Sequence, residues 1–146
     1  MKKAITLILC ACLALSLGIS ACADYTAEDL VKELQEMEHT FDYYAVELED
    51  DIIYMKIAMD GTTAQALKLK QKENFDEWKE ITDELDEVSE MLQERADECD
   101  GELLTCVMLL NDQNDENVLY SVTNGICLYD FVTGYDIEDE LAADAE

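Results

Sequence analysis

The chain has 146 residues, and its 36 acidic against nine basic residues make a formal net charge of −27 at pH 7. Such acidity excludes nucleic acid as a partner, because phosphate binding needs a basic surface. It also opposes direct adsorption to anionic lipid, which favours clusters of Lys and Arg. Cations and proteins with a basic face are the partners that the charge favours, although the same charge also serves solubility and repulsion between copies.

The N-terminus has the three-part layout of a bacterial export signal. Lys2 and Lys3 precede an apolar run over residues 4–17, and small residues such as Ser20 and Ala21 follow it. The run is shorter than the roughly 20 apolar residues of a membrane-spanning helix, which argues against a retained anchor helix. No other segment of the sequence approaches that length. We therefore expect the remainder to be a soluble domain outside the cytoplasm.

Two cleavage rules fit the end of this signal. Ile19-Ser20-Ala21-Cys22 matches a lipobox, so that residues 1–21 would be removed and Cys22 would receive a lipid. Ala21-Cys22-Ala23 matches an A-x-A site, so that cleavage after Ala23 would release a soluble protein. We expect lipidation of Cys22 and attachment to the outer face of the cell membrane through that lipid alone, with free secretion as the alternative.

The exported part is more acidic than the whole chain. All 36 acids follow residue 23 and only seven basic residues remain there, which gives a formal net charge of −29. Periodic apolar residues and the absence of Pro indicate one folded domain over residues 22–135 rather than a disordered chain. The last segment, 136–146, contains six acids and is predicted to be frayed.

Three cysteines remain after either cleavage. Cys99, Cys106 and Cys127 form an odd set, which cannot pair completely within one chain. They show neither a C-x-x-C spacing nor a neighbouring His, so we predict no zinc site and no cofactor. Small apolar packing residues are the expected role of Cys106 and Cys127, and a single disulfide is the alternative.

The first half of the domain predicts a helix and a hairpin. Thr26 can cap a helix over residues 26–39, whose apolar residues recur at spacings of three and four. Alternating apolar residues then flank the acidic turn at residues 49–51, which predicts a β-hairpin. With a short turn, Val46 falls opposite Ile53 and Tyr44 falls opposite Met55, and all four share one face.

The second half predicts a long helical region and three strands. Helical residues dominate from about 62 to 98, and Asn74 could begin a new helix after a short one over 64–72. Strands follow over 103–110, 118–123 and 126–132, the last two joined by the hairpin signal Asn124-Gly125. That turn places Val122 opposite Cys127 and Tyr120 opposite Tyr129. The pairing of the first strand then places Cys106 opposite Val122.

These elements predict an α+β two-layer sandwich in the order α-ββ-α-βββ, with two main helices on one face of an antiparallel sheet of about five strands. The predicted inner wall of the last three strands comprises Leu104, Cys106, Met108, Leu110, Val118, Tyr120, Val122, Cys127, Tyr129 and Phe131. The opposite face is predicted to be open, and its residues are the candidate binding face: Thr105, Val107, Leu119, Ser121, Ile126 and Leu128.

This layout resembles that of small exported proteins and lipoproteins of unknown function from Gram-positive anaerobes. These begin with an export signal that ends at a cysteine and continue as helix, hairpin, helix and hairpin. The present chain differs because no Gly/Ser/Asn-rich stretch follows Cys22. The resemblance implies an envelope location and supplies no catalytic residue.

No motif in the chain indicates catalysis. His39, the only histidine, is expected to interact with the C-terminal end of the first helix. Asp130 is the one acid set among strand aromatics, which an edge-strand or outer-face position explains. The loop from Asp112 to Asn117 lacks the Gly and Glu of a calcium-binding loop and is expected to be solvated, with weak Ca²⁺ binding as the alternative.

We therefore expect a non-enzymatic domain that binds another macromolecule, namely a protein and preferably one with a basic face. The alternatives are a freely secreted acidic inhibitor or decoy and a cation-binding protein.

Overall fold

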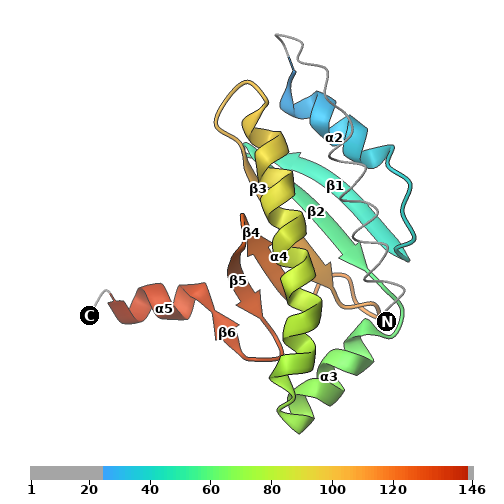
Figure 1. Ribbon diagram of the computed structural model, residues 1–146, viewed down its shortest axis with the longest axis vertical. Coiled ribbons are helices and arrows are strands. Elements are labelled where there is room, and N and C mark those ends of the chain that lie inside the picture. The colour runs from blue at the N-terminus through green and yellow to red at the C-terminus, as the bar shows by residue number, and fades with distance from the viewer. Residues whose placement is uncertain (1–24, 145–146) are drawn as a thin grey trace.

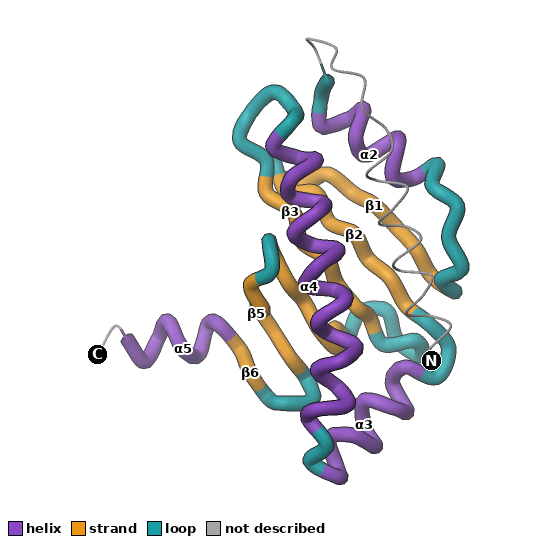
Figure 2. Tube along the Cα trace, in the orientation of Figure 1, coloured by secondary structure: helices purple, strands orange, loops and turns teal. Residues whose placement is uncertain are grey.

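The computed structural model describes residues 25–144 as one sheet with helices packed on it (Figure 1). The strands are β1 Tyr43–Glu49, β2 Ile52–Ala58, β3 Leu104–Leu110, β4 Val118–Thr123, β5 Ile126–Asp130 and β6 Tyr135–Asp136. The helices are α2 Ala27–Gln35, α3 Thr62–Lys72, α4 Phe75–Asp97 and α5 Ile137–Asp144. The predicted α+β two-layer class is confirmed: α2 and α4 lie over the same face of the sheet (Figure 2).

The sheet has six strands, one more than predicted, in the order β1-β2-β3-β4-β5-β6. The five predicted strands all occur, but β2 and β3 are parallel to each other, whereas an antiparallel sheet was predicted. The reason is the connection between them, because α3 and α4 carry the chain back along the sheet before β3 begins, as a parallel crossover requires. None of the helices between residues 25 and 144 combines the length and apolar character needed to cross a membrane.

The first hairpin confirms the predicted face and corrects the predicted register. Asp50 and Asp51 both have positive φ, 49° and 63°, as a two-residue type I′ turn requires. This tight turn places Val46 opposite Met55 rather than opposite Ile53. The shift of two residues leaves the same side chains facing the helices, because side-chain direction in a strand repeats every two residues.

Helix α2 is shorter than predicted. Thr26 and Asp29 form a reciprocal capping box at its start, as the sequence indicates. The helix ends at Gln35 instead of residue 39. His39 therefore lies beyond the helix end, where its ring packs 4.3 Å from the ring of Tyr44, and the expected interaction with the helix terminus is wrong.

Helix α4 supplies the main apolar layer over the sheet. Its predicted stripe is buried at Trp78, Ile81, Leu85, Val88, Leu92 and Ala96. Phe75 is the exception, since 43% of its side chain is exposed at the first turn of the helix. The predicted break before α4 is confirmed: α3 ends at Lys72, and Glu73 adopts a positive φ of 53° between the two helices.

The predicted face of β3 is wrong. Val107, not Cys106, pairs with Val122, so the strand is shifted by one residue relative to the prediction. A shift of one residue turns every side chain of a strand to the other face. Thr105 and Val107 are consequently fully buried under α4, whereas Leu104 is 59% exposed. The cause lies in the strand itself, because Thr105 is its one polar residue and the rest of the strand carries no alternation that would select a face.

The predicted tail contains regular secondary structure as far as Asp144. Tyr135 and Asp136 form the short strand β6 beside β5, and residues 137–144 form α5. Figure 1 shows α5 projecting from the body of the molecule instead of covering the sheet. The tyrosine hydroxyl of Tyr135 donates a hydrogen bond to Glu140, 2.6 Å away, which ties the strand to the helix.

The loop that superficially resembles a calcium site caps a helix instead. Helix α3 begins after Gly61, which has no side chain to serve as a cap. Asp112, distant in sequence, accepts hydrogen bonds from the backbone N–H groups of Gly61 (2.8 Å) and Thr63 (3.0 Å). Burial alone would raise the pKa of the Asp112 carboxyl, but its bonds to the Thr63 side chain and to these amides outweigh burial and lower the pKa.

This arrangement predicts a pH-dependent stabilisation by Asp112. Replacing Asp112 with Ala should lower the free energy of unfolding by about 1–2 kcal/mol at pH 7, as loss of a helix cap does. Because the folded-state pKa is lowered, the contribution is complete above the unfolded pKa of about 4 and disappears as the pH falls through the folded value. Urea unfolding of both proteins between pH 7 and 3 measures this difference. Asp115→Ala, an exposed change in the same loop, is the control and should cost less than about 0.5 kcal/mol.

Candidate functional site

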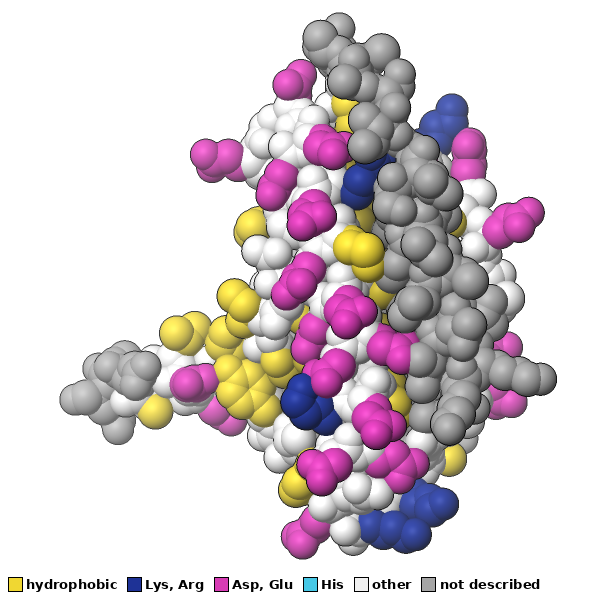
Figure 3. All heavy atoms as spheres, in the orientation of Figure 1, with side chains coloured by type: hydrophobic (Ala, Val, Ile, Leu, Met, Phe, Trp, Pro, Cys, Tyr) yellow, Lys and Arg dark blue, Asp and Glu magenta, His cyan; other side chains and the backbone are white. Residues whose placement is uncertain are grey.

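A cleft of about 640 Å³ lies between the first half of α4 and the C-terminal strands. Its lining is aromatic at several points and acidic along α4. The lining residues are Phe75, Asp76, Trp78, Lys79, Thr82, Asp83, Asp86, Tyr120, Cys127, Asp130, Thr133, Gly134 and Tyr135. Figure 3 shows hydrophobic side chains gathered beside the lower half of α4, with Asp and Glu side chains along the helix next to them. The volume falls within the range of small-molecule and side-chain binding pockets.

The base of the cleft is built on Trp78 and Asp130. The indole N–H of Trp78, the only tryptophan of the chain, donates to the Asp130 carboxylate at 2.9 Å. The same carboxylate oxygen accepts from the backbone N–H groups of Val132 (2.8 Å) and Thr133 (3.2 Å). Asp130 is only 6% exposed and faces α4, so its expected place on an outer face or at an edge is wrong. Its carboxylate fixes the turn that follows β5 against the helix.

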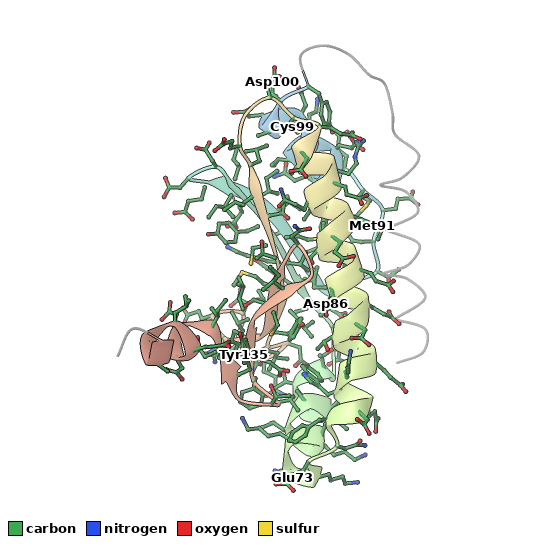
Figure 4. The ribbon with its side chains drawn as sticks, turned by 60° about the vertical axis from the view of Figure 1, so that its left-hand side comes forward. Glu73, Asp86, Met91, Cys99, Asp100 and Tyr135 are labelled. Carbon is green, nitrogen blue, oxygen red and sulfur yellow. The ribbon has the colours of Figure 1, made fainter. Side chains whose placement is uncertain are left out.

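The middle of the cleft holds a pair formed by Tyr120 and Asp86. The Tyr120 hydroxyl donates to the Asp86 carboxylate at 2.7 Å, which connects β4 to α4. Burial raises the pKa of Asp86, and the bond from Tyr120 offsets only part of this effect. Figure 4 shows Asp86 midway along α4 and Tyr135 on the separate strand β6. Asp86 is thus a half-buried carboxyl whose ionised form is disfavoured in the free protein.

A thiol lies beside this pair. Cys127 is half-buried on β5, opposite Val122 as predicted. Burial raises the pKa of the Cys127 thiol, and the neighbouring Tyr120 hydroxyl lowers it by less. Burial and the bond to Asp86 likewise raise the pKa of Tyr120. Both groups are therefore held in their neutral forms near pH 7.

The mouth of the cleft carries two exposed acids and one base. Asp76 and Asp83 are exposed on α4, and Lys79 forms an ion pair with Asp83. The side chains of this pair are 68% and 52% exposed, so that water screens their attraction. Phe75 contributes an exposed ring at the same end of the helix.

The candidate binding face predicted from the sequence is not an open surface. Thr105 and Val107 are fully buried under α4, Leu119 is 3% exposed and Ser121 is 6% exposed. Only Ile126, at 58%, is well exposed, and Leu128 is half-buried. The prediction is wrong for Thr105 and Val107 because the one-residue shift of β3 turned both toward α4, whereas Leu119 and Ser121 are buried although β4 keeps its predicted face.

The register shows which strand residues lie on the other face. Met108 pairs with Ser121, which pairs with Tyr129. On β2 the residues that alternate with the buried Ile53 and Met55 point the same way. A bulge after Ser121 explains why Tyr120 lies opposite Asp130 instead of Tyr129. No helix of the described chain covers this face in Figures 1 and 2.

The remaining predicted positions carry no site in the structure. Ala21, Cys22 and Ala23, the residues of the predicted lipidation and cleavage site, lie outside the described residues. Cys99, Cys106 and Cys127 are free thiols. Within residues 25–144, no three His, Cys, Asp or Glu side chains converge as a metal site would require.

Comparison with known proteins adds no further information on the site. No protein-family model matches the chain, and no curated protein or solved structure shows significant similarity to it.

Sequence reasoning missed this cleft, although two of its signals are visible in the sequence. Phe75 begins an apolar stripe one turn before the helix reaches the sheet, and Asp130 is an acid between two strand aromatics. Neither signal indicates which residues lie opposite. The juxtaposition depends on how α4 crosses β4 and β5, which no local pattern encodes.

The Asp86 environment predicts an unusual effect on stability. Asp86→Asn should increase the free energy of unfolding at pH 7, because burial and the neighbouring Asp83 and Glu90 disfavour the carboxylate more than Tyr120 and Lys79 favour it. A folded pKa above the unfolded value lowers stability as the pH rises through it. Urea unfolding should therefore show the gain at pH 7 and its disappearance near pH 3. A variant less stable than the wild type at pH 7 would contradict this assignment.

Proposed function

We propose that this chain is an exported, non-enzymatic domain that binds another macromolecule through the cleft between α4 and β6. A lipid on Cys22 attaches it to the outer face of the membrane, and its partner is a protein with a basic face. The observation that carries the proposal is the cleft itself, which exposes an aromatic ring and carboxylates at its mouth while its inner polar groups bond to one another.

The chemistry of the inner groups favours binding over catalysis. Three donors occupy one oxygen of Asp130, which makes this carboxylate part of the framework. The raised pKa of Cys127 disfavours the thiolate that a nucleophile needs. The raised pKa of Tyr120 in the same way disfavours its use as a base.

The start of the described chain supports a defined orientation at the membrane. Tyr25 is held to the end of α4, where its carbonyl accepts from the N–H of Asp100 at 3.1 Å. Tyr25 follows Cys22 by three positions, a span of at most about 11 Å. A lipid on Cys22 would thus place the C-terminal end of α4 next to the membrane. The cleft lies along the opposite half of this helix of 23 residues, which is about 34 Å long, and would face away from the membrane.

The first test concerns attachment. Replacing Cys22 with Ser in the full-length protein removes the only acceptor for the lipid, so the protein should move from the membrane fraction to the medium or the soluble fraction. Immunoblotting of fractionated cells measures the shift, and Cys12→Ser within the signal is the control that should change nothing. Equal membrane association of both variants would exclude the lipid anchor and leave free secretion as an inhibitor or decoy.

The second test concerns the cleft. Thr133 is exposed on the cleft wall, and Thr133→Trp should fill its mouth without altering the core. Chemical cross-linking in envelope preparations, followed by mass spectrometry, should recover a protein partner with the wild type but not with this variant. Gln113→Trp, an equally bulky change on the exposed loop before β4, is the control and should retain the partner. Retention of the same partner by Thr133→Trp would contradict binding in the cleft.

A further inference from the structure

We infer that the cleft recognises a basic segment of a protein partner and holds an Arg or Lys side chain. The apolar stem would lie along the rings of Phe75 and Tyr135, and the cationic head would face Asp83 and Asp86. This inference rests on the proposed function and names the chemistry of its ligand.

The walls fit the stem of such a side chain. Phe75 is a large apolar residue left 43% exposed in a domain that buries the rest of the α4 stripe. Tyr135, half-buried on β6, lines the same cleft. Long basic side chains commonly place their methylene groups on apolar surface and their heads in polar surroundings. Aromatic rings also attract the cationic head itself, and Arg more often than Lys.

The charges fit the head of the side chain. Asp76, Asp83 and Asp86 contribute carboxylates from one helix, and among residues 25–144 Lys79 is the only basic residue that lines the cleft. A cation next to Asp86 would compensate a carboxylate whose ionised form burial disfavours. The formal net charge of −27 would attract a basic segment from a distance.

Lys79 already occupies part of this site in the free protein. Its ammonium group is paired with Asp83 at the mouth of the cleft, and it also acts electrostatically on Asp86. The pair is well exposed and contributes little to stability, so a ligand cation can replace it at small cost. Lys79 therefore competes with the ligand. Removing its charge should strengthen binding.

The requirement for an apolar stem separates this ligand from small cations. A divalent cation would need several convergent carboxylates, and the described residues form no such group. The structure thus favours a cationic head on an apolar stem, as in an Arg or Lys side chain, over a compact metal ion.

The experiment uses two blocked synthetic peptides, Leu-Arg-Leu-Arg-Leu and its counterpart with citrulline in place of arginine, which has a similar shape without the charge. Titration into the folded domain, followed by ¹⁵N NMR, gives both the affinity and the residues that are perturbed. We expect the arginine peptide to bind at least about tenfold more tightly than the citrulline peptide, the order of effect of one close charge pair. The perturbed amides should surround the cleft.

Variants assign the effect to the cleft. Asp86→Asn should lower the affinity for the arginine peptide by about tenfold without loss of stability. Lys79→Gln should raise that affinity several-fold. Glu87→Gln removes the same charge from the exposed side of α4, away from the cleft lining, and should change the affinity less than about twofold. Because Asp86→Asn is expected to stabilise the domain, weaker binding by this variant cannot be attributed to unfolding.

Four results would overturn the inference: equal affinity for both peptides, no binding of either, equal losses in Asp86→Asn and Glu87→Gln, or perturbations confined to another surface. In each of these cases, cross-linking separates the inference from the proposed function. If it still recovers a partner with the wild type and loses it with Thr133→Trp, the cleft binds a ligand of different chemistry, and the proposed function stands. If that difference is absent as well, both fail.

Discussion

The packing of α4 across the sheet is the interaction on which the rest of the structure depends. Each large apolar side chain that it buries contributes about 1.5–3 kcal/mol. Hydrogen bonds then fix its position along the sheet. Near one end Trp78 donates to Asp130, and near the other the amide of Gln93 donates to the carbonyl of Leu103 at 2.9 Å. The buried guanidinium of Arg95, the only arginine of the chain, pairs with Glu33 and so attaches α2 to the same helix. Helix α4 thereby holds together α2, the parallel crossover and the C-terminal strands.

This dependence on one helix also explains the acidity and the site. The outward side of α4 is free for carboxylates, which repel other copies and favour solubility. Toward its N-terminal end the helix passes the short strand β6, and the two elements leave the cleft between them. Asp86, which borders the cleft, thus lies half-buried beside the ring of Tyr120 instead of in open solvent. A charge that would otherwise be a general surface property becomes part of a shaped site.

Local signals predicted the elements well where they were strong. The capping residue Thr26, the positive-φ turn of Asp50 and Asp51, and the regular stripe of α4 each specify a structure within a few residues of the chain. The predictions failed where the decision was not local. In β3 every position except Thr105 is apolar and no alternation selects a face, so only the pairing of Val107 with Val122 decides that Thr105 is covered and Leu104 exposed. The Gly125 turn shows the same dependence, because its N–H donates to Ser89 of α4 at 2.8 Å and a larger residue would meet Glu90.

The sequence by itself determined the acidic balance, the α+β class and the succession of helices and strands, because these follow from composition and from hydrophobic periods of two and about 3.6 residues. Only the tertiary structure decided which face of β3 is buried, that Asp112 caps α3, and that Asp86, Tyr120 and Tyr135 share one cleft. These outcomes depend on strand register and on the line along which α4 crosses the sheet. Both arise from contacts between residues far apart in the chain, whose preferences no local window of sequence contains.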